Sequence, residues 1–160
     1  MTRTVAIAPV RKSIRVNVSQ RRSFDVFTAG LDRWWPREAK IGNAPVKAVV
    51  LEPRLGGRWY ERGEDGAETD VGRILVWEPP RRFVLSWDVS GSWKPDRTMS
   101  SEVEVRFTAQ GPNGTLVELE HRNFTEATAA MRESVDGGWP RMLDRFKSVA
   151  ETSAAGDPGR

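Results

Sequence analysis

The alternation of apolar and polar residues predicts an N-terminal strand followed by a helix. In residues 11–18, isoleucine and valine recur at every second position, which is the period of a strand buried on one face. Ser19 then offers an N-cap for a helix that continues to Trp34-Trp35. Pro36 ends this helix, because a proline disfavours helical backbone at the residue before it.

From residue 46 to residue 122 the pattern is that of successive strands joined by turns. The expected strands are residues 46–51, 58–62, 71–77, 82–87, 102–108 and 115–122. Between the second and the third, Gly63 to Gly66 has the composition of a tight hairpin turn. Residues 90–100 are rich in glycine, serine and charged side chains, and we expect them to form a longer loop.

The hairpin of residues 102–108 and 115–122 has the clearest pattern. In both segments apolar side chains, or His121, alternate with charged ones, which predicts an antiparallel pair with one buried and one solvated face. Pairing residue 106 with residue 118 would set Glu102 opposite Arg122. The same register would set Val103 opposite His121.

After residue 122 the period changes to that of a helix. One apolar stripe is formed by Trp139, Met142, Leu143, Phe146, Val149 and Ala150. Asp136 is the expected N-cap of this helix, with Pro140 in its first turn, where a proline is tolerated. Residues 126–134 form a separate helical segment in this interpretation.

This order of elements predicts an α+β fold, in which the C-terminal helix covers the apolar face of one antiparallel sheet. We expect a single domain over residues 10–151, a flexible N-terminus over residues 1–9 and a disordered tail over residues 152–160. No segment is long and apolar enough for a membrane span or a secretory signal. With no cysteine in the sequence, we expect a cytoplasmic location.

Composition adds an excess of tryptophan and an uneven charge. There are seven tryptophans against one tyrosine, and so many large rings need a core, a cavity or an interface. Residues 1–62 carry 13 basic and 5 acidic side chains, whereas residues 63–160 carry 12 and 17. The basic residues are scattered rather than clustered, so we do not expect nucleic acid as a partner.

The chain resembles a known family at six sites that occur in the same order. These are Trp34-Trp35, Leu55-Gly56-Gly57-Arg58-Trp59, Gly72-Arg73-Ile74, Glu78 to Phe83 with Trp87, Gly114-Thr115 with Leu119-Glu120-His121, and Gly138-Trp139. They are similar to the homologues of the activator of the heat-shock-90 ATPase, within the START-like (SRPBCC) superfamily. The resemblance, which spans about residues 10–151, implies a helix-grip fold, a curved sheet wrapped around a long C-terminal helix. That family includes co-chaperones, lipid or hormone binders, relatives of polyketide cyclases and stand-alone bacterial proteins.

The resemblance implies a cavity between the sheet and the C-terminal helix. Its expected lining is Trp34, Trp35, Trp59, Glu61, Trp87, Val103, Val105, Leu119, His121, Trp139, Met142 and Phe146. Trp59 and Trp87 suit either a cavity wall or a packed core, whereas Trp139 and Phe146 are more typical of helix-to-sheet packing. Trp93, in the expected loop, is a candidate lid residue or an exposed ring.

His121, the only histidine, is either a polar anchor of this cavity or a core histidine satisfied by a neighbour. One histidine and no cysteine give no metal-ligand pattern, and we expect no cofactor and no catalytic residue. We therefore expect a small apolar or aromatic ligand, such as a lipid or a polyketide. The alternatives are a co-chaperone-like interaction module and a cyclase or hydrolase using His121 with a carboxylate. A homodimer stays open, and a chaperone partner is not favoured.

Overall fold

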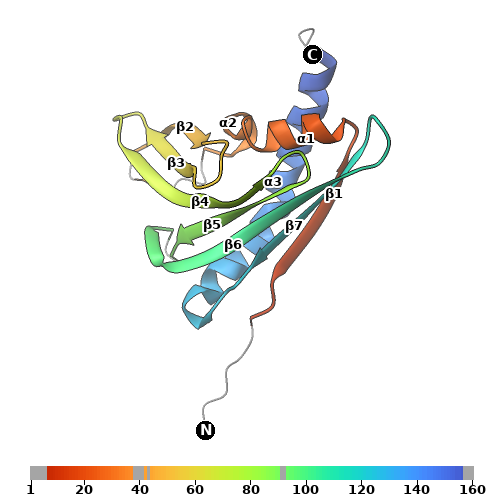
Figure 1. The fold of residues 1–160 in the computed structure, drawn as a ribbon. Helices are drawn as coiled ribbons and strands as arrows, with labels where there is room; N and C mark the ends of the chain where they lie inside the picture. Colours follow the sequence, from red (N-terminus) through yellow and green to blue (C-terminus); the bar gives the residue numbers. More distant parts are fainter. Residues whose placement is uncertain (1–6, 38–41, 43, 91–92, 157–160) are drawn as a thin grey trace.

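The structure is a computed structural model that describes residues 7–37, 42, 44–90 and 93–156 (Figure 1). Its helices are α1 (Gln20–Phe27), α2 (Leu31–Trp34), the short 3₁₀ helix η1 (Glu126–Thr128) and α3 (Ala129–Gly156). Its strands are β1 (Val10–Val16), β2 (Val46–Leu51), β3 (Arg58–Gly63), β4 (Glu68–Glu78), β5 (Arg82–Val89), β6 (Pro95–Ala109) and β7 (Thr115–Arg122). The predicted order of elements, a strand and helices before a run of strands and a long helix, is confirmed.

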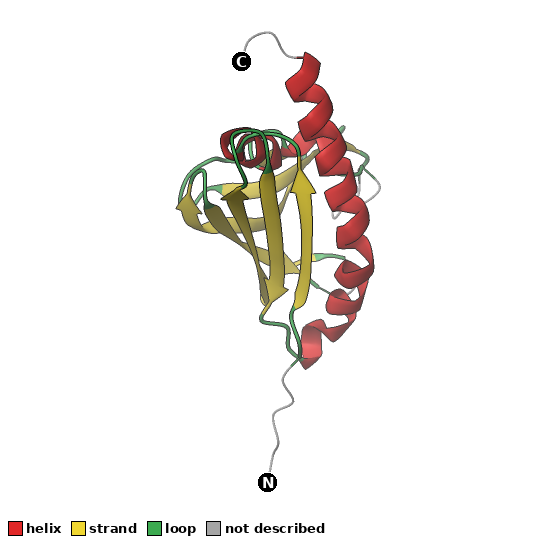
Figure 2. Cartoon of the chain, turned by 90° about the vertical axis from the view of Figure 1, so that its right-hand side faces the viewer, coloured by secondary structure: helices red, strands yellow, loops and turns green. Residues whose placement is uncertain are grey.

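The strands form one antiparallel sheet in the order β1-β7-β6-β5-β4-β3-β2. Strands β2 to β7 are therefore a meander, and β1 closes onto β7 at one edge. The sheet curves, and α3 runs along its inner side (Figure 2). This is the helix-grip α+β architecture expected from the sequence. The predicted register is also confirmed, because Arg106 pairs with Glu118 and Val103 pairs with His121.

Strand β6 is longer than predicted. It begins at Pro95, so most of the expected loop over residues 90–100 is strand. Pro95 pairs with Val89, and Ser100 pairs with Asp88 on the neighbouring strand β5. Polar side chains hide this part of the strand in the sequence, because it is held by backbone pairing with β5 and not by an alternating apolar face.

The first predicted helix is divided into α1 and α2. Ser19 is its N-cap as expected, with its hydroxyl accepting from the backbone N–H of Arg22 at 3.1 Å. The break falls at Gly30, where a β-carbon would lie 2.8 Å from the carbonyl oxygen of Val26. The chain turns there in a space that only glycine fits, so one helix was the wrong prediction.

The prediction of Asp136 as an N-cap, with a separate helix before it, is also wrong. Helix α3 is continuous from Ala129, and Pro140 lies in its interior. Met131 and Val135 are fully buried and extend the apolar stripe towards the N-terminus, which offsets the hydrogen bond that Pro140 cannot make. Asp136 instead pairs with Lys12 on β1 at 2.9 Å. The helix continues to Gly156, within the range 152–160 that we expected to be a disordered tail.

A cluster of phenyl rings fills the core beneath α1. Phe24, Phe27, Phe83 and Phe107 contact one another with ring centroids 5.2 to 6.1 Å apart. Phe146 joins α3 to this group, 4.9 Å from Phe27. These rings carry no polar atom and act as packing. Within the described ranges, no helix has the length and apolar composition needed to cross a membrane.

Candidate functional site

All of the side chains expected to line a cavity are directed into the interior. The buried set is Trp34, Trp35, Trp59, Glu61, Trp87, Val103, Val105, Leu119, His121, Trp139, Met142 and Phe146. Their aromatic rings fall into two groups, which meet where Trp34 contacts Trp35 at 5.7 Å. Trp34 and Phe146 contact Phe27, each at 4.9 Å, and belong with the phenyl rings. The indole N–H of Trp34 is bonded to the carbonyl of Val26, so this ring has a structural role.

The other group is an indole cluster centred on Trp87. It consists of Trp35, Trp59, Trp87, Trp93 and Trp139, which come from the end of α2, β3, β5, the β5–β6 loop and α3. Their ring centroids lie 5.2 to 6.2 Å from that of Trp87, mostly edge to face. Gly72, the register partner of Trp59 on the intervening strand β4, has no side chain to separate Trp59 from Trp87. The sheet and α3 thus bring together, from distant segments, five indole rings that each carry one N–H group.

Two of these indoles are buried without a hydrogen-bond partner. The Nε1–H groups of Trp59 and Trp87 meet no acceptor among the described residues, although each ring is only 1% exposed. An unpaired buried donor costs about 1–3 kcal/mol, so natural proteins rarely keep two of them side by side without a use. An acceptor on a bound molecule would remove this cost.

His121 lies against the same cluster, 5.0 Å from the ring of Trp87. Its Nδ1 accepts from the indole N–H of Trp139 at 3.2 Å, and its Nε2 lies 2.8 Å from the hydroxyl of Ser101. Because an indole can only donate, Nδ1 must be unprotonated, and the ring proton of neutral His121 sits on Nε2. His121 therefore donates to Ser101. Burial lowers the pKa of His121 to about 3, which keeps the ring neutral at physiological pH.

These contacts leave His121 poorly suited to act as a base. Both of its ring nitrogens are occupied, and neither partner is a carboxylate. For Ser101 to become a nucleophile, Nε2 would have to accept its proton, but Nε2 already carries one. The arrangement is that of a core histidine satisfied by its neighbours, the second of the two sequence interpretations.

Ser101 is a site residue that the sequence analysis did not single out. It pairs with Trp87 on β5, and it lies two residues before Val103 on the same face of β6. The predicted pairing of Val103 with His121 was enough to place Ser101 diagonally beside the histidine. The signal was present in the register, but a serine with no base beside it in sequence does not by itself indicate a site residue.

Glu61 lies next to the cluster, two residues after Trp59 on β3. Its carboxylate accepts from the backbone N–H of Gly42 at 3.0 Å. It lines a surface recess of about 400 Å³ together with Gly42, Ala44, Gly63, Asp65, Ala67, Thr69, Lys94 and Pro95. Lys94, one of its lining residues, follows Trp93 in the chain, and Trp93 is half-buried against Trp87.

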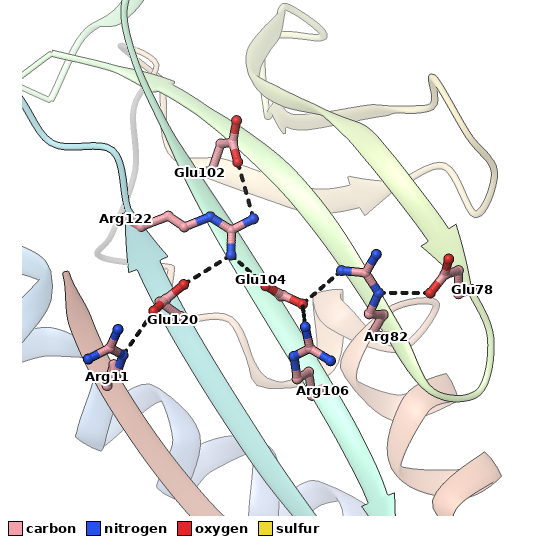
Figure 3. A network of polar contacts seen from close by, with 8 residues as sticks. All are labelled: Arg11, Glu78, Arg82, Glu102, Glu104, Arg106, Glu120 and Arg122. Carbon is pink, nitrogen blue, oxygen red and sulfur yellow. Dashed lines mark hydrogen bonds and ion pairs between the residues drawn. The ribbon is translucent and has the colours of Figure 1, made fainter.

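The outer face of the sheet carries a different polar network (Figure 3). Its eight residues are Arg11, Glu78, Arg82, Glu102, Glu104, Arg106, Glu120 and Arg122. Glu104 is central, with its carboxylate paired to Arg82, Arg106 and Arg122. Arg122 also pairs with Glu102 and Glu120, and Arg82 pairs with Glu78.

This network neutralises arginines that could otherwise attract phosphate groups. Burial alone would raise the pKa of Glu104, but hydrogen bonds from Arg122 and Arg82 outweigh it and lower that pKa. The hydrogen bond from Arg122 likewise lowers the pKa of Glu120. Both glutamates are therefore ionised at neutral pH, and they bind arginines from four strands, β1, β5, β6 and β7. In the described part of the chain, no group of three or more acidic or histidine side chains could hold a metal ion.

Comparisons with known proteins identify related sequences and folds. The family model described as Activator of Hsp90 ATPase homolog 1-like protein matches residues 17–151. A solved complex of the anthrahydroquino-gamma-pyrone synthase Txn09 is 37% identical, with 90% of this chain and 97% of that chain covered and a TM-score of 0.63. CalC, a self-sacrificing resistance protein from Micromonospora echinospora, is 29% identical over 91% and 95% of the two chains, with a TM-score of 0.67.

A third solved structure shares the fold at low identity. The Aha1 dimer from Colwellia psychrerythraea is 18% identical, with 91% and 97% of the chains covered and a TM-score of 0.65. The comparison with curated proteins finds no match.

Proposed function

Since the chain belongs to the family of Activator of Hsp90 ATPase homolog 1-like proteins, we propose that it binds a planar aromatic small molecule of the polyketide type. The binding site in this proposal is the indole cluster between the sheet and α3. The family on its own allows several kinds of ligand and partner, so the choice among them rests on the residues of this interior.

The observation that carries the proposal is the convergence of four other indoles on Trp87. A core needs apolar volume, which the phenyl rings beneath α1 supply without polar atoms. The indole cluster instead combines flat apolar faces with N–H groups, which is the mixture found in pockets for aromatic ligands. Edge-to-face contacts between the indoles could be replaced by contacts with the rings of a ligand at similar energy.

The relatives support the choice of ligand class. Txn09, at 37% identity over most of both chains, is a synthase for an anthrahydroquino-gamma-pyrone, and an anthrahydroquinone is a flat system of three fused rings. A molecule of that shape matches the aromatic character of the indole cluster. In the present arrangement the indoles pack on one another, so binding has to displace at least one ring. Because Trp93 is only half-buried, its displacement removes fewer packing contacts than displacement of a fully buried indole would.

The test is thermal unfolding in the presence of matched ligand classes. We expect anthraquinones or related polyketides to raise the Tm, because a ligand at 100 times its Kd adds about 2.7 kcal/mol to the stability of the folded state. For a chain of this size that corresponds to roughly 5–10 °C. Fatty acids of similar carbon number serve as the aliphatic comparison. The absence of a shift with every aromatic ligand would reject the proposal.

A second candidate function is ring closure on such a ligand, and the name of Txn09 is the observation that favours it. His121 would not be its base, because both of its nitrogens are engaged and its pKa is depressed. Mass spectrometry of the recovered ligand separates the two functions. A binding protein returns the ligand unchanged, whereas a synthase returns a product of different mass or ring pattern.

The remaining partner predictions stay proposals of lower rank. The Colwellia relative is described as a dimer, and a homodimer of this chain can be checked by sedimentation velocity. We also propose a cytoplasmic location, with which the lack of cysteine is compatible.

A further inference from the structure

We infer that the interior site selects ligands that present hydrogen-bond acceptors, carbonyl or phenolate oxygens, to a set of donors on β3, β5 and β6. The inference rests on the proposed function and adds the chemistry of the ligand that the site prefers. The donors are the indole N–H groups of Trp59 and Trp87 and the hydroxyl of Ser101.

Trp59 and Trp87 supply two of the donors. Trp59 and Trp87 lie with ring centroids 5.2 Å apart, and both N–H groups are buried without a partner. An indole N–H has no lone pair to offer and can only donate. A purely apolar ligand would leave both donors unsatisfied, whereas a ligand oxygen could accept from one or both of them.

The hydroxyl of Ser101 supplies the third donor. A hydroxyl usually serves as donor or acceptor according to its surroundings, but here one role is assigned. Trp139 donates to Nδ1 of His121, so Nε2 is protonated and donates to the Ser101 oxygen. The hydrogen of the Ser101 hydroxyl remains available to donate onward. The side chains of Trp139 and His121 thus hold Ser101 as a further donor.

The three donors, Trp59, Trp87 and Ser101, lie close together. Ser101 is the register partner of Trp87 across β5 and β6, and the ring of His121 lies 5.0 Å from that of Trp87. The two indoles and the serine therefore belong to one small region on the inner face of the sheet. A site of this kind favours quinones, ketones and phenolates over hydrocarbons of the same outline.

The experiment is a calorimetric comparison of two ligands that differ only in acceptors. The probes are 2-(hydroxymethyl)anthraquinone and 2-(hydroxymethyl)anthracene, which share three fused rings and one side group. We expect the wild-type protein to bind the quinone at least about tenfold more tightly, since its two carbonyl oxygens can each satisfy a buried donor.

Variants connect this preference to the named donors. Trp87→Phe and Ser101→Ala should each reduce the quinone preference, measured as the ratio of the two affinities, to within about threefold. The ratio of the two affinities cancels any general loss of packing in a variant. Trp77→Phe is the matched control, because Trp77 packs against Phe24 in the phenyl cluster, and it should keep the full preference.

The outcomes separate this inference from the proposed function. Binding of neither probe to the wild-type protein would overturn both. Equal binding of the two probes would overturn the inference alone, and so would a quinone preference that survives both Trp87→Phe and Ser101→Ala. Ser101→Ala removes a single oxygen, so it keeps the test informative even where a tryptophan substitution impairs folding.

Discussion

Glu104 is a carboxylate on which three arginine side chains converge, and its side chain is only 9% exposed. In the sequence it is one of many glutamates on a charged strand face, and the alternation along residues 102–108 identified that face correctly. What the sequence does not contain is the sharing of one carboxylate by Arg82, Arg106 and Arg122, because these residues come from different strands. Single-residue roles of this kind depend on lateral neighbours.

Replacing Glu104 by Gln should lower the free energy of unfolding by about 1–2 kcal/mol. The amide removes the negative charge that compensates three guanidinium groups, and the partial exposure of the arginines moderates the loss. Chemical denaturation with urea measures the change. Glu118→Gln on the same face of β7 is the control and should stay within about 0.5 kcal/mol of wild type. An equal effect of the two substitutions would mean that Glu104 has no special role in the network.

The tryptophans show a second limit of sequence reasoning at this scale. Their burial could be predicted, since seven large rings cannot all remain solvated. Their separation into Trp34 among phenyl rings and Trp59 with Trp87 among indoles could not. That division follows from the curvature of the sheet and from which side chains α3 presents to each end.

At the scale of elements, local patterns predicted the strands and their pairing well, and predicted helix boundaries poorly. The register of the β6–β7 hairpin was predicted correctly to the residue, because a slip by one position would expose its valines. The start of α3 was wrong because Pro140 and Asp136 suggested a helix start that tertiary burial of Met131 and Val135 overrides. The early start of β6 was missed because its first residues are polar and are held by β5.

Glycines in different elements should respond in opposite ways to alanine substitution. Gly137 lies on the exposed side of α3 with nothing within 4 Å of a β-carbon, so Gly137→Ala should stabilise the protein by about 0.5–1 kcal/mol. Thermal unfolding measures this effect. A loss of stability would show that α3 needs the flexibility of glycine at this point.

Gly72 on β4 is the opposite case. A β-carbon there would lie 1.8 Å from the backbone carbonyl oxygen of Ser86, a distance that only a backbone shift can relieve. Gly72→Ala should therefore destabilise the protein by more than about 2 kcal/mol or prevent folding. The same measurement applies, and a neutral result would mean that β4 and β5 can separate at this point without cost.

At the scale of the whole molecule, buried and paired ionisable groups connect stability to pH. Burial lowers the pKa of His121 to about 3, well below the usual value for an unfolded chain. At every pH between these two values, His121 is therefore protonated in the unfolded state and neutral in the folded state. The contribution of His121 to the free energy of unfolding is fully present above about pH 6.5 and is lost as the pH falls.

Between pH 6.5 and pH 5, the protein should lose about 2 kcal/mol of stability, which is the effect of one proton taken up on unfolding. Urea denaturation across this range measures the slope. His121→Asn should be less stable at pH 7 but nearly independent of pH over the same interval. A wild-type stability that does not change between pH 6.5 and 5 would contradict the depressed pKa of His121. Below about pH 4.3, protonation of Glu104 and Glu120 adds a further loss, since their pKa values are lowered by arginine partners.

The indole cluster has a consequence for how this molecule handles light. Rings as close as 5.2 to 6.2 Å exchange electronic excitation much faster than they emit it, so a photon absorbed by any of the five is pooled among them. Emission should consequently be strongly depolarised. A quinone bound beside Trp87 would accept an electron from this shared excited state and quench the fluorescence of all five indoles. The emission of Trp77, which packs against Phe24 among the phenyl rings, would then account for most of the light that remains.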